Sequence, residues 1–277
     1  SDPSGNNNSA DFYLYLKDLL APTAICKNIS TVLGANGQVL ITAADVNNGS
    51  SDACGIQSMS LNVSSFNCSK VGANNVILTV MDMSGNVSTC TSLVTVVDNL
   101  KPIALCKNVT VALGSSGTAN LTTSQVNNGS SDNCSIQSMT LSQTAFNCGS
   151  IGNNTVTLTV TDAYQNTATC SSTVTVVDNS KPTALCRNMT LNLNAAGSGT
   201  ISTSDINNGS SDNCAFTLAL NKTSFNCSNV GSNTVTLTAT DASGNTAACQ
   251  GSVTVKDVTA PTAVCKNVSV VLGSNGE

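Results

Sequence analysis

The sequence predicts an all-β chain made of several small tandem domains, and three observations support this prediction. The phrase NNGSSDNC at 127–134 recurs almost unchanged at 47–54 and 207–214, so the phrase returns every 80 residues (47, 127, 207). Short stretches alternate apolar residues with threonine or serine, which is typical of half-buried strands. Thirteen cysteines are spread through polar, turn-rich sequence. A period longer than about 50 residues indicates separate domains, each with its own core.

The composition shows why each domain needs covalent support. Aromatic residues make up 3% of the chain and tryptophan is absent, so the cores must consist mostly of aliphatic side chains. A domain of this size with so thin a core is marginally stable unless it is crosslinked. Cysteines spread in this way are typical of disulfides in secreted proteins. The chain has no CxxC pair and no histidine, which argues against a zinc site.

The strands are predicted from the two-residue alternation. In NTVTLTVTDA (154–163), Val156, Leu158 and Val160 share one face, and SSTVTVVD (171–178) repeats the pattern. LCKNVTVAL (105–113) and TANLTTSQV (118–126) are predicted as two earlier strands joined by the turn GSSG. No segment shows helical periodicity. Six or seven strands per repeat indicate tandem immunoglobulin-like β-sandwich domains, each with two disulfides, arranged as beads on a string.

The joints between domains share a pattern in which a strand ends at Asp and the next unit begins with Pro. The joints are VVDNLKP (96–102), VVDNSKP (176–182) and VKDVTAP (255–261), and proline stiffens each of them. DFYLYLKD (11–18) lies in the same register, so we expect a window on a longer array. The expected parts are the end of a preceding unit or an N-terminal strand (1–18), three repeats (19–98, 99–178 and 179–257) and the start of a further repeat (258–277).

One repeated phrase resembles a known family. TLTATDASGNTAAC (236–249) is similar to the hyalin-repeat (HYR) family, whose units begin with Pro-x-x-x-Cys and end with T-x-T-A-T-D-x-x-G-N-x-x-x-C. PTALC (182–186), TVTDAYQNTATC (159–170) and TVMDMSGNVSTC (79–90) match with small departures, and the resemblance covers the chain from about residue 18 onward. It implies an extracellular adhesion module of the kind found in large surface adhesins of gliding and other Bacteroidetes bacteria. HYR units are not enzymes, so the resemblance assigns no catalytic residue.

Four cysteines per repeat allow three pairings, and the resemblance implies one of them. Family units with only two cysteines keep the first and last positions. The resemblance therefore implies the pairs Cys26–Cys90, Cys106–Cys170 and Cys186–Cys249. It leaves Cys54–Cys68, Cys134–Cys148 and Cys214–Cys227 as local crosslinks, whose closed loops of about 15 residues would each contribute about 3 kcal/mol.

Charge and residue types exclude several classes of function. The net charge is −5 and only ten residues are Lys or Arg, so there is no basic surface for nucleic acid or for anionic lipid. No apolar run approaches the roughly 20 residues needed to span a bilayer. The absence of histidine excludes Ser-His-Asp and Cys-His catalytic groups, and we predict that the chain is not an enzyme.

The acidic residues suggest one candidate ligand. Nine of the fifteen acidic residues recur at equivalent positions in the repeats. Joint and loop carboxylates, together with carbonyl oxygens, could hold Ca²⁺, which takes six to eight oxygen ligands from flexible loops. The alternative is that each Asp caps its own turn through a hydrogen bond to the backbone. The candidate calcium ligands are Asp98, Asp178, Asp257, Asp132 and Asp212.

These patterns favour a structural stalk or filament segment of an adhesin, outside the cell or on its surface. One alternative is an array that binds surface glycans through its loops, but the loop at 127–134 is nearly invariant among the three copies, which favours a scaffold. Another alternative is a filament subunit in which DFYLYLKD inserts as a strand into a neighbouring copy. The expected partners are therefore other copies of the repeat or chain, or surface glycans.

Overall fold

The computed structural model describes residues 3–5, 9 and 11–276. Within this part the chain is all-β, with three consecutive repeats that carry the same order of elements and five disulfides. This confirms the predicted fold class of tandem sandwich-like domains. The chain also divides into two compact units, and the division passes through the middle repeat. Unit 1 runs up to Lys107 and includes Thr123–Ser142 and Val156–Ser172, and unit 2 contains Asn108–Thr122, Gln143–Thr155 and the residues from Thr173 onward.

The first repeat contains six strands in two sheets. A four-stranded sheet has the order β1-β6-β5-β3, and a second sheet pairs β2 with β4. Most of the hydrogen bonding lies in the long antiparallel pair β5 and β6. The elements are β1 (Ile29–Val32), β2 (Gln38–Leu40), α1 (Ala43–Val46), β3 (Ile56–Leu61), β4 (Ser65–Asn67), the 3-10 turn η1 (Cys68–Lys70), β5 (Gly72–Asp82) and β6 (Val87–Val97).

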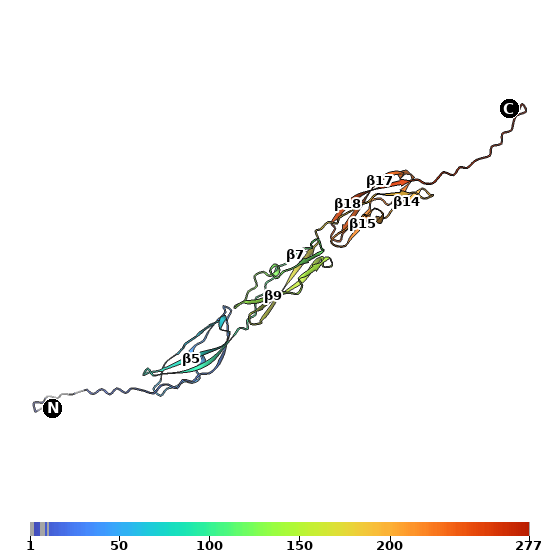
Figure 1. The fold of residues 1–277 in the computed structure, drawn as a ribbon. Helices are drawn as coiled ribbons and strands as arrows, with labels where there is room; N and C mark the ends of the chain where they lie inside the picture. The colour runs from blue at the N-terminus through green and yellow to red at the C-terminus, as the bar shows by residue number, and fades with distance from the viewer. Residues whose placement is uncertain (1–2, 6–8, 10, 277) are drawn as a thin grey trace. The chain divides into compact units, whose positions relative to one another are not determined.

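The other two repeats have the same plan, with sheet orders β7-β12-β11-β9 and β13-β18-β17-β15. Figure 1 shows β17 and β18, the long antiparallel pair of the third repeat, side by side. The elements of the second repeat are β7 (Val109–Ala112), β8 (Thr118–Asn120), α2 (Thr123–Val126), β9 (Ile136–Leu141), β10 (Ala145–Asn147), η2 (Cys148–Ser150), β11 (Gly152–Asp162) and β12 (Thr167–Val177). Those of the third are β13 (Met189–Asn192), β14 (Ser198–Thr200), α3 (Thr203–Ile206), β15 (Phe216–Leu220), β16 (Ser224–Asn226), η3 (Cys227–Asn229), β17 (Gly231–Asp241) and β18 (Thr246–Lys256).

The core of each repeat is aliphatic, as the composition predicts. In β11, Val156, Leu158 and Val160 are completely buried, so the predicted alternation is confirmed. In the first repeat the buried core contains nine side chains, and Phe66 is its one aromatic residue. Cys134, which belongs to the second repeat, packs against this core as well. The small interior of the first repeat is thus completed by a residue from its neighbour.

A one-turn helix replaces part of a predicted strand. TANLTTSQV (118–126) was expected to be a single strand, but β8 ends at Asn120 and α2 begins at Thr123. The equivalent helices α1 and α3 begin with capping boxes, in which Asp45 or Asp205 accepts hydrogen bonds from the preceding Thr42 or Ser202. Three residues of strand followed by a Ser/Thr-capped turn look like a continuous strand when only alternation is counted.

The first and last strands of a repeat run parallel. β1 pairs with β6 from Ile29 opposite Val94 to Val32 opposite Val97. Two polar contacts reinforce this pairing. The Asn28 side chain accepts a hydrogen bond from the Leu93 N–H at 2.9 Å. The buried Ser92 hydroxyl donates to the Lys27 carbonyl at 2.7 Å. The place where the chain enters the repeat is therefore bonded to the strand by which it leaves.

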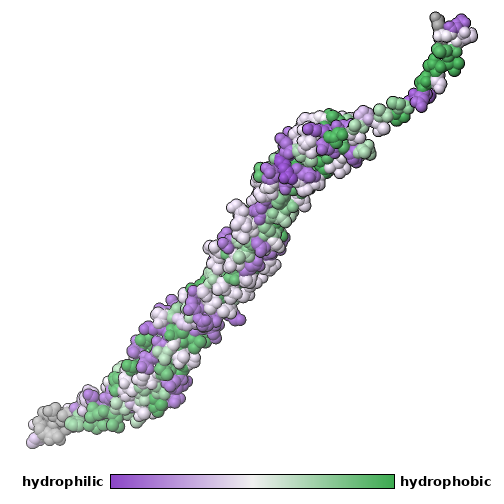
Figure 2. All heavy atoms as spheres, turned by 45° about the vertical axis from the view of Figure 1, so that its right-hand side comes forward, coloured by the Kyte–Doolittle hydropathy of each residue, from purple (hydrophilic) through white to green (hydrophobic). Residues whose placement is uncertain are grey.

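The segments at the two ends of the described chain differ from the repeats because they contain no strands. DFYLYLKD (11–18) forms no strand, and Phe12 and Leu16 are each 92% exposed. After β18 the residues form no strand either, and Figure 2 shows a run of hydrophobic residues near the C-terminus. Within the described residues, none of the helices has the length and apolar character needed to cross a bilayer.

Candidate functional site

Three disulfides each close one repeat. Their Cα atoms are 5.7 to 5.8 Å apart, and each bond joins the segment before the first strand to the middle of the last strand. They are the pairs that the resemblance implies. These three bonds are Cys26–Cys90, Cys106–Cys170 and Cys186–Cys249.

The other two disulfides join consecutive repeats, and the predicted local crosslinks were wrong. Cys68 bonds to Cys134, and Cys148 bonds to Cys214. The predicted pairs Cys54–Cys68, Cys134–Cys148 and Cys214–Cys227 do not form. The cysteines that remain as exposed free thiols are Cys54, Cys227 and Cys265.

Strand direction explains why Cys54 and Cys68 do not form the predicted bond. Cys54 lies beside Asp18, where the chain enters the first repeat. Cys68 lies beside the carbonyl of Gly37, in the turn that follows β1. Between the two cysteines, the six residues of β3 carry the chain about 20 Å along the sheet. A disulfide requires Cα atoms less than about 7 Å apart, so the short spacing in sequence does not bring these two cysteines together.

The five disulfides overlap along the sequence. The Cys68–Cys134 bond begins before Cys90, where the first repeat's own crosslink ends, and the next bond begins at Cys106, before Cys134. The Cys148–Cys214 bond overlaps with its two neighbours in the same way. Every peptide bond between Cys26 and Cys249 is therefore bypassed by at least one disulfide.

The disulfides between repeats lie where two backbones approach each other closely. Gly37 has φ +70°, and a Cβ atom there would lie 2.5 Å from the carbonyl oxygen of Asn133. Gly117 has the same φ and the same 2.5 Å approach to the carbonyl oxygen of Asn213. The left-handed backbone and the lack of space both require glycine at these positions. In unit 1 the Tyr164 hydroxyl also donates a hydrogen bond to the Cys68 carbonyl.

Three aspartates converge at the joint that follows β6. One carboxylate oxygen each from Asp98, Asp132 and Asp162 lies within 4.8 Å of the other two. Asp98 follows β6, Asp132 comes two residues before Cys134, and Asp162 ends β11. Asp98 is 5% exposed and Asp162 is completely buried. Three acidic groups from three separate stretches of chain therefore share one buried place.

Hydrogen bonds hold these carboxylates in position but do not use all of their oxygens. Asp162 accepts from the N–H groups of Tyr164 and Asn166, and Asn166 also donates through its side chain to Asp162 Oδ2 and to the Asp98 carbonyl. Asp132 Oδ2 accepts from the Cys134 N–H at 2.9 Å. Three buried oxygens have no protein donor. They are Asp98 Oδ2, Asp132 Oδ1 and Asn133 Oδ1.

The joint that follows β12 repeats this arrangement in unit 2. Asp178, Asp212 and Asp241 offer carboxylate oxygens within 4.8 Å of one another, and Asp178 is 4% exposed. The buried oxygens without a donor are again the equivalent ones, Asp178 Oδ2, Asp212 Oδ1 and Asn213 Oδ1.

The structure brings four of the five predicted metal-ligand candidates into these two clusters. The fifth, Asp257, is exposed, and its carboxylate accepts a hydrogen bond from the N–H of Thr259 at 2.9 Å. Asp162 and Asp241 were not among the predicted ligands, and neither were the asparagines beside the clusters. The signal that could have found them is the Asp-x-x-x-Asn spacing at 162–166, which is also present at 82–86 and 241–245.

Asp241 stays ionised in its buried position. Burial acts to raise its pKa, but hydrogen bonds from the side chain and backbone of Asn245 and from the Ser243 N–H outweigh that effect. The pKa of Asp241 therefore lies below its ordinary value, and Asp82 in the first repeat is held in the same way. The third repeat's cluster thus keeps at least this negative charge at neutral pH.

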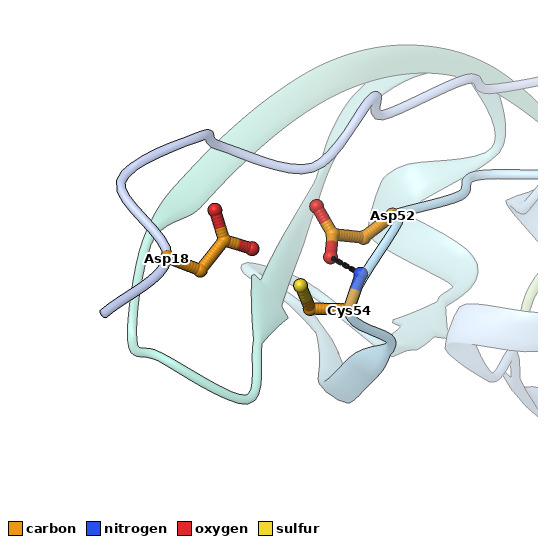
Figure 3. Close-up of side chains that lie close together, drawn as sticks. All are labelled: Asp18, Asp52 and Cys54. Carbon is orange, nitrogen blue, oxygen red and sulfur yellow. Dashed lines mark hydrogen bonds between the residues drawn. The ribbon is translucent and has the colours of Figure 1, made fainter. Parts of the chain in front are cut away.

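The first repeat has a third, more open cluster. Asp18, Asp52 and the free thiol of Cys54 lie together, as Figure 3 shows, and the Cys54 N–H donates to Asp52 at 2.8 Å. Asp18 and Asp52 are partly exposed and Cys54 is exposed. A hydrogen bond to the Asp18 carboxylate and the charge of that carboxylate raise the pKa of the Cys54 thiol above its ordinary value.

The chain matches no protein-family model, and no curated protein sequence matches it. Several solved structures are similar at low identity. An I-band fragment of titin is 14% identical, with 86% of this chain and 99% of that chain covered and a TM-score of 0.39. A fragment of mouse cadherin-23 is 13% identical, with 86% and 99% covered and a TM-score of 0.33.

The extracellular cadherin domains 1–4 of protocadherin gamma B7 are 13% identical to the chain, with a TM-score of 0.31. The match covers 69% of this chain and 59% of that one, so the chain spans less than two thirds of that protein's length.

Proposed function

We propose that the chain is a structural segment of an extracellular repeat adhesin, a stalk or filament that projects a distal tip and carries mechanical load. The observation that supports this most strongly is the overlapping series of disulfides from Cys26 to Cys249. A binding module needs only its own fold to be stable. A covalent path that bypasses every intervening peptide bond serves a chain that is pulled or attacked by proteases.

The geometry of a single repeat fits this role. A pull on the chain before Cys26 passes through the Cys26–Cys90 disulfide into β6 and leaves at Asp98. The residues between the two cysteines, a sequence separation of 64, lie outside this path. β1 is among the bypassed residues, so the pull does not draw it away from β6 and the hydrogen bonds between the two strands carry no load. The sandwich core is thereby protected from the applied force.

Each joint has a second covalent connection besides the linker. The chain passes from β6 through Asp98 to Cys106, and the Cys68–Cys134 bond runs beside it within unit 1. Two connections restrict bending and twisting at a joint far more than one flexible linker does. The proline at 102 and the close contact of Gly37 with Asn133 act in the same direction.

The proposed location follows from the same bonds. Disulfides form and persist in oxidising environments outside the cytosol. The five disulfides and the HYR-like phrases support a place outside the cell, as part of a bacterial surface adhesin.

Single-molecule pulling on the full chain tests the proposal. In oxidised protein we expect no long unfolding step from any repeat. After reduction each repeat should release its bypassed residues, which corresponds to roughly 210 to 230 Å of added extension. Long steps of that size from oxidised protein would show that the crosslinks do not carry the load, and the proposal would fail.

A second candidate is a filament subunit that exchanges a strand with a neighbouring copy, and one observation favours it. The segment DFYLYLKD (11–18) is highly exposed and unpaired, and its apolar residues would suit the last-strand position of a sandwich. Light scattering of the chain with and without residues 11–18 distinguishes the two candidates. Assembly that depends on this segment supports strand exchange, and a monomer in both cases supports the simple stalk.

A further inference from the structure

The two buried aspartate clusters contain more than turn-capping requires. An aspartate that only caps a turn directs its oxygens to nearby donors in that turn. Asp162 does this with both oxygens, because Oδ1 accepts from the Tyr164 and Asn166 N–H groups and Oδ2 from the Asn166 side chain. Asp98 and Asp132 each keep one buried oxygen with no protein donor. Leaving a buried charged oxygen without a partner is costly. Asp98 is only 5% exposed and its Oδ2 is itself buried, so bulk water does not satisfy this oxygen.

The aspartates that carry the unpartnered oxygens have their carboxylates in one small volume. One oxygen from each of Asp98, Asp132 and Asp162 lies within 4.8 Å of the other two. Asn133 adds a buried amide oxygen without a donor, while its amide nitrogen donates to Asp98 Oδ1 at 3.2 Å. Three carboxylates this close repel one another unless a cation or a shared proton lies between them.

The second joint provides an independent copy of the same evidence. Its three aspartates lie within the same limit, and the same three kinds of oxygen lack donors. Asn213 also donates to Asp178 Oδ1 at the same distance of 3.2 Å. The third joint aspartate, Asp257, has no such neighbours among the described residues and is exposed.

We propose that each of these two joints binds one calcium ion. The donors are all oxygen, which suits a hard cation and not zinc or copper. Two oxygens that bind one calcium ion at 2.3 to 2.6 Å are at most about 5.2 Å apart, and the oxygens of each cluster all lie closer together than that. Calcium also tolerates the irregular mixture of carboxylate and amide oxygens offered here, whereas magnesium requires a nearly ideal octahedron.

Bound calcium would connect three parts of each joint. In unit 1 the ion joins the end of β6 through Asp98, the crosslinked loop through Asp132 and the end of β11 through Asp162. Asp132 lies two residues before Cys134, so the ion and the disulfide fix the same loop. The mechanical role proposed above does not depend on calcium, so the two proposals fail separately.

Calorimetric titration of the oxidised full chain with calcium chloride tests the proposal, after the protein has been treated with chelator. We expect Asp132→Asn and Asp212→Asn each to remove one equivalent of bound calcium, and the double variant to remove both. Asp257→Asn is the matched control, because it changes an equivalent joint aspartate outside the clusters, and it should bind as the parent does. The melting temperature of the parent, but not of the double variant, should rise with calcium.

Two results would overturn the proposal. One is a parent protein that binds no calcium at millimolar concentration while its disulfides are intact. The other is a double variant that retains the parent's calcium equivalents and its calcium-dependent melting temperature. Circular dichroism of the double variant and mass mapping of its disulfides would show that it folds, so that loss of binding is not mistaken for unfolding.

Discussion

The first and second repeats contain nearly the same eight-residue phrase, at 47–54 and 127–134, but the two phrases form different sites. In the second repeat the phrase ends in Cys134, which is bonded to Cys68, and its aspartate shares a buried cluster with Asp98. In the first repeat it ends in Cys54, an exposed free thiol beside a partly exposed pair of carboxylates (Figure 3).

This difference shows that the phrase supplies only half of a joint. The other half comes from the preceding repeat, which contributes Cys68, the close-packed Gly37 and the buried Asp98. The phrase itself also differs at one position, because Asn133 is replaced by Ala53 in the first repeat. The first repeat therefore lacks the side chain that donates to the joint aspartate in the other two.

The opposite end of the array gives a complementary comparison. Cys227 is equivalent to Cys68 and Cys148, but it is exposed and free. A Cβ atom at Gly197 would meet the Cys227 sulfur, whereas at Gly37 and Gly117 it would also meet the backbone of the next repeat. Cys54 and Cys227 are thus the two unmatched halves of the same kind of crosslink.

Removing a crosslink between repeats should have the largest effect. The bond Cys68–Cys134 spans a sequence separation of 66, and the chain-entropy model assigns about 4 kcal/mol to a loop of that length. We expect the double variant Cys68→Ser/Cys134→Ser to lose about that much free energy of unfolding in denaturant titrations. Cys54→Ser/Cys227→Ser changes equivalent cysteines that form no bond and should lose less than about 0.5 kcal/mol. Equal losses in the two double variants would contradict the comparison.

Protease treatment tests directly whether the crosslinks between repeats are present. A single cut between Cys26 and Cys249 should leave one covalent species on a nonreducing gel and two fragments after reduction, because a disulfide bypasses every such cut. In the Cys68→Ser/Cys134→Ser variant, a cut in the linker between Cys90 and Cys106 should release fragments without reduction. If the parent releases the same fragments under nonreducing conditions, the bonds between repeats are not present in solution.

The glycines at the joints should give the next largest effect. Gly117→Ala places a Cβ 2.5 Å from a carbonyl oxygen of the following repeat, whereas Gly197→Ala has a similar positive φ and meets only a sulfur atom. Both substitutions strain the backbone by about 1 to 2 kcal/mol. Gly117→Ala should lower the free energy of unfolding by at least about 1 kcal/mol more than Gly197→Ala, because the backbone of the following repeat must also move. Denaturant midpoints measure both variants, and equal costs would show that the close approach does not matter.

Much of the fold could be predicted from the sequence because the evidence is local. Alternation in 154–163 predicted the buried face of β11, where Val156, Leu158 and Val160 are completely buried. The short helix α2 could not be found in this way, since four residues are too few to show a helical period.

The partners of the second set of cysteines could not be predicted for a different reason. Cys68 and Cys134 are far apart in sequence and meet only through the packing of two repeats. Spacing favoured the nearer cysteine, and only strand direction shows that Cys54 and Cys68 lie apart. In each aspartate cluster the joint and loop residues were predicted, because they recur together in the sequence. The third aspartate was not predicted, because in the first cluster this is Asp162, which comes from the end of β11.

The asparagine that distinguishes the joints should have a moderate effect. Asn133→Ala removes one of the two hydrogen bonds to Asp98 Oδ1, which keeps the bond from the Leu100 N–H, and should destabilise the chain by about 1 to 2 kcal/mol. Ala53→Asn adds the same side chain to the open cluster of the first repeat, and its stability should stay within about 0.5 kcal/mol of the parent. Thermal unfolding of both variants measures the difference, and a destabilising Ala53→Asn would show that the amide is unfavourable in the phrase itself.

The smallest expected effect concerns the thiol that lacks a partner. Alkylation requires the thiolate, and the Asp18 carboxylate raises the pKa of Cys54, so less thiolate is present at a given pH. Asp18→Asn removes that charge, so the pKa of Cys54 should fall and its alkylation near pH 8 should become a few times faster. Mass spectrometry of iodoacetamide-treated protein gives the rate as a function of pH, with Cys227 in the same molecule as the internal control. An unchanged pH profile would mean that Asp18 does not contact the thiol in solution, and that the chain before the first repeat is not held beside the phrase as it is at the crosslinked joints.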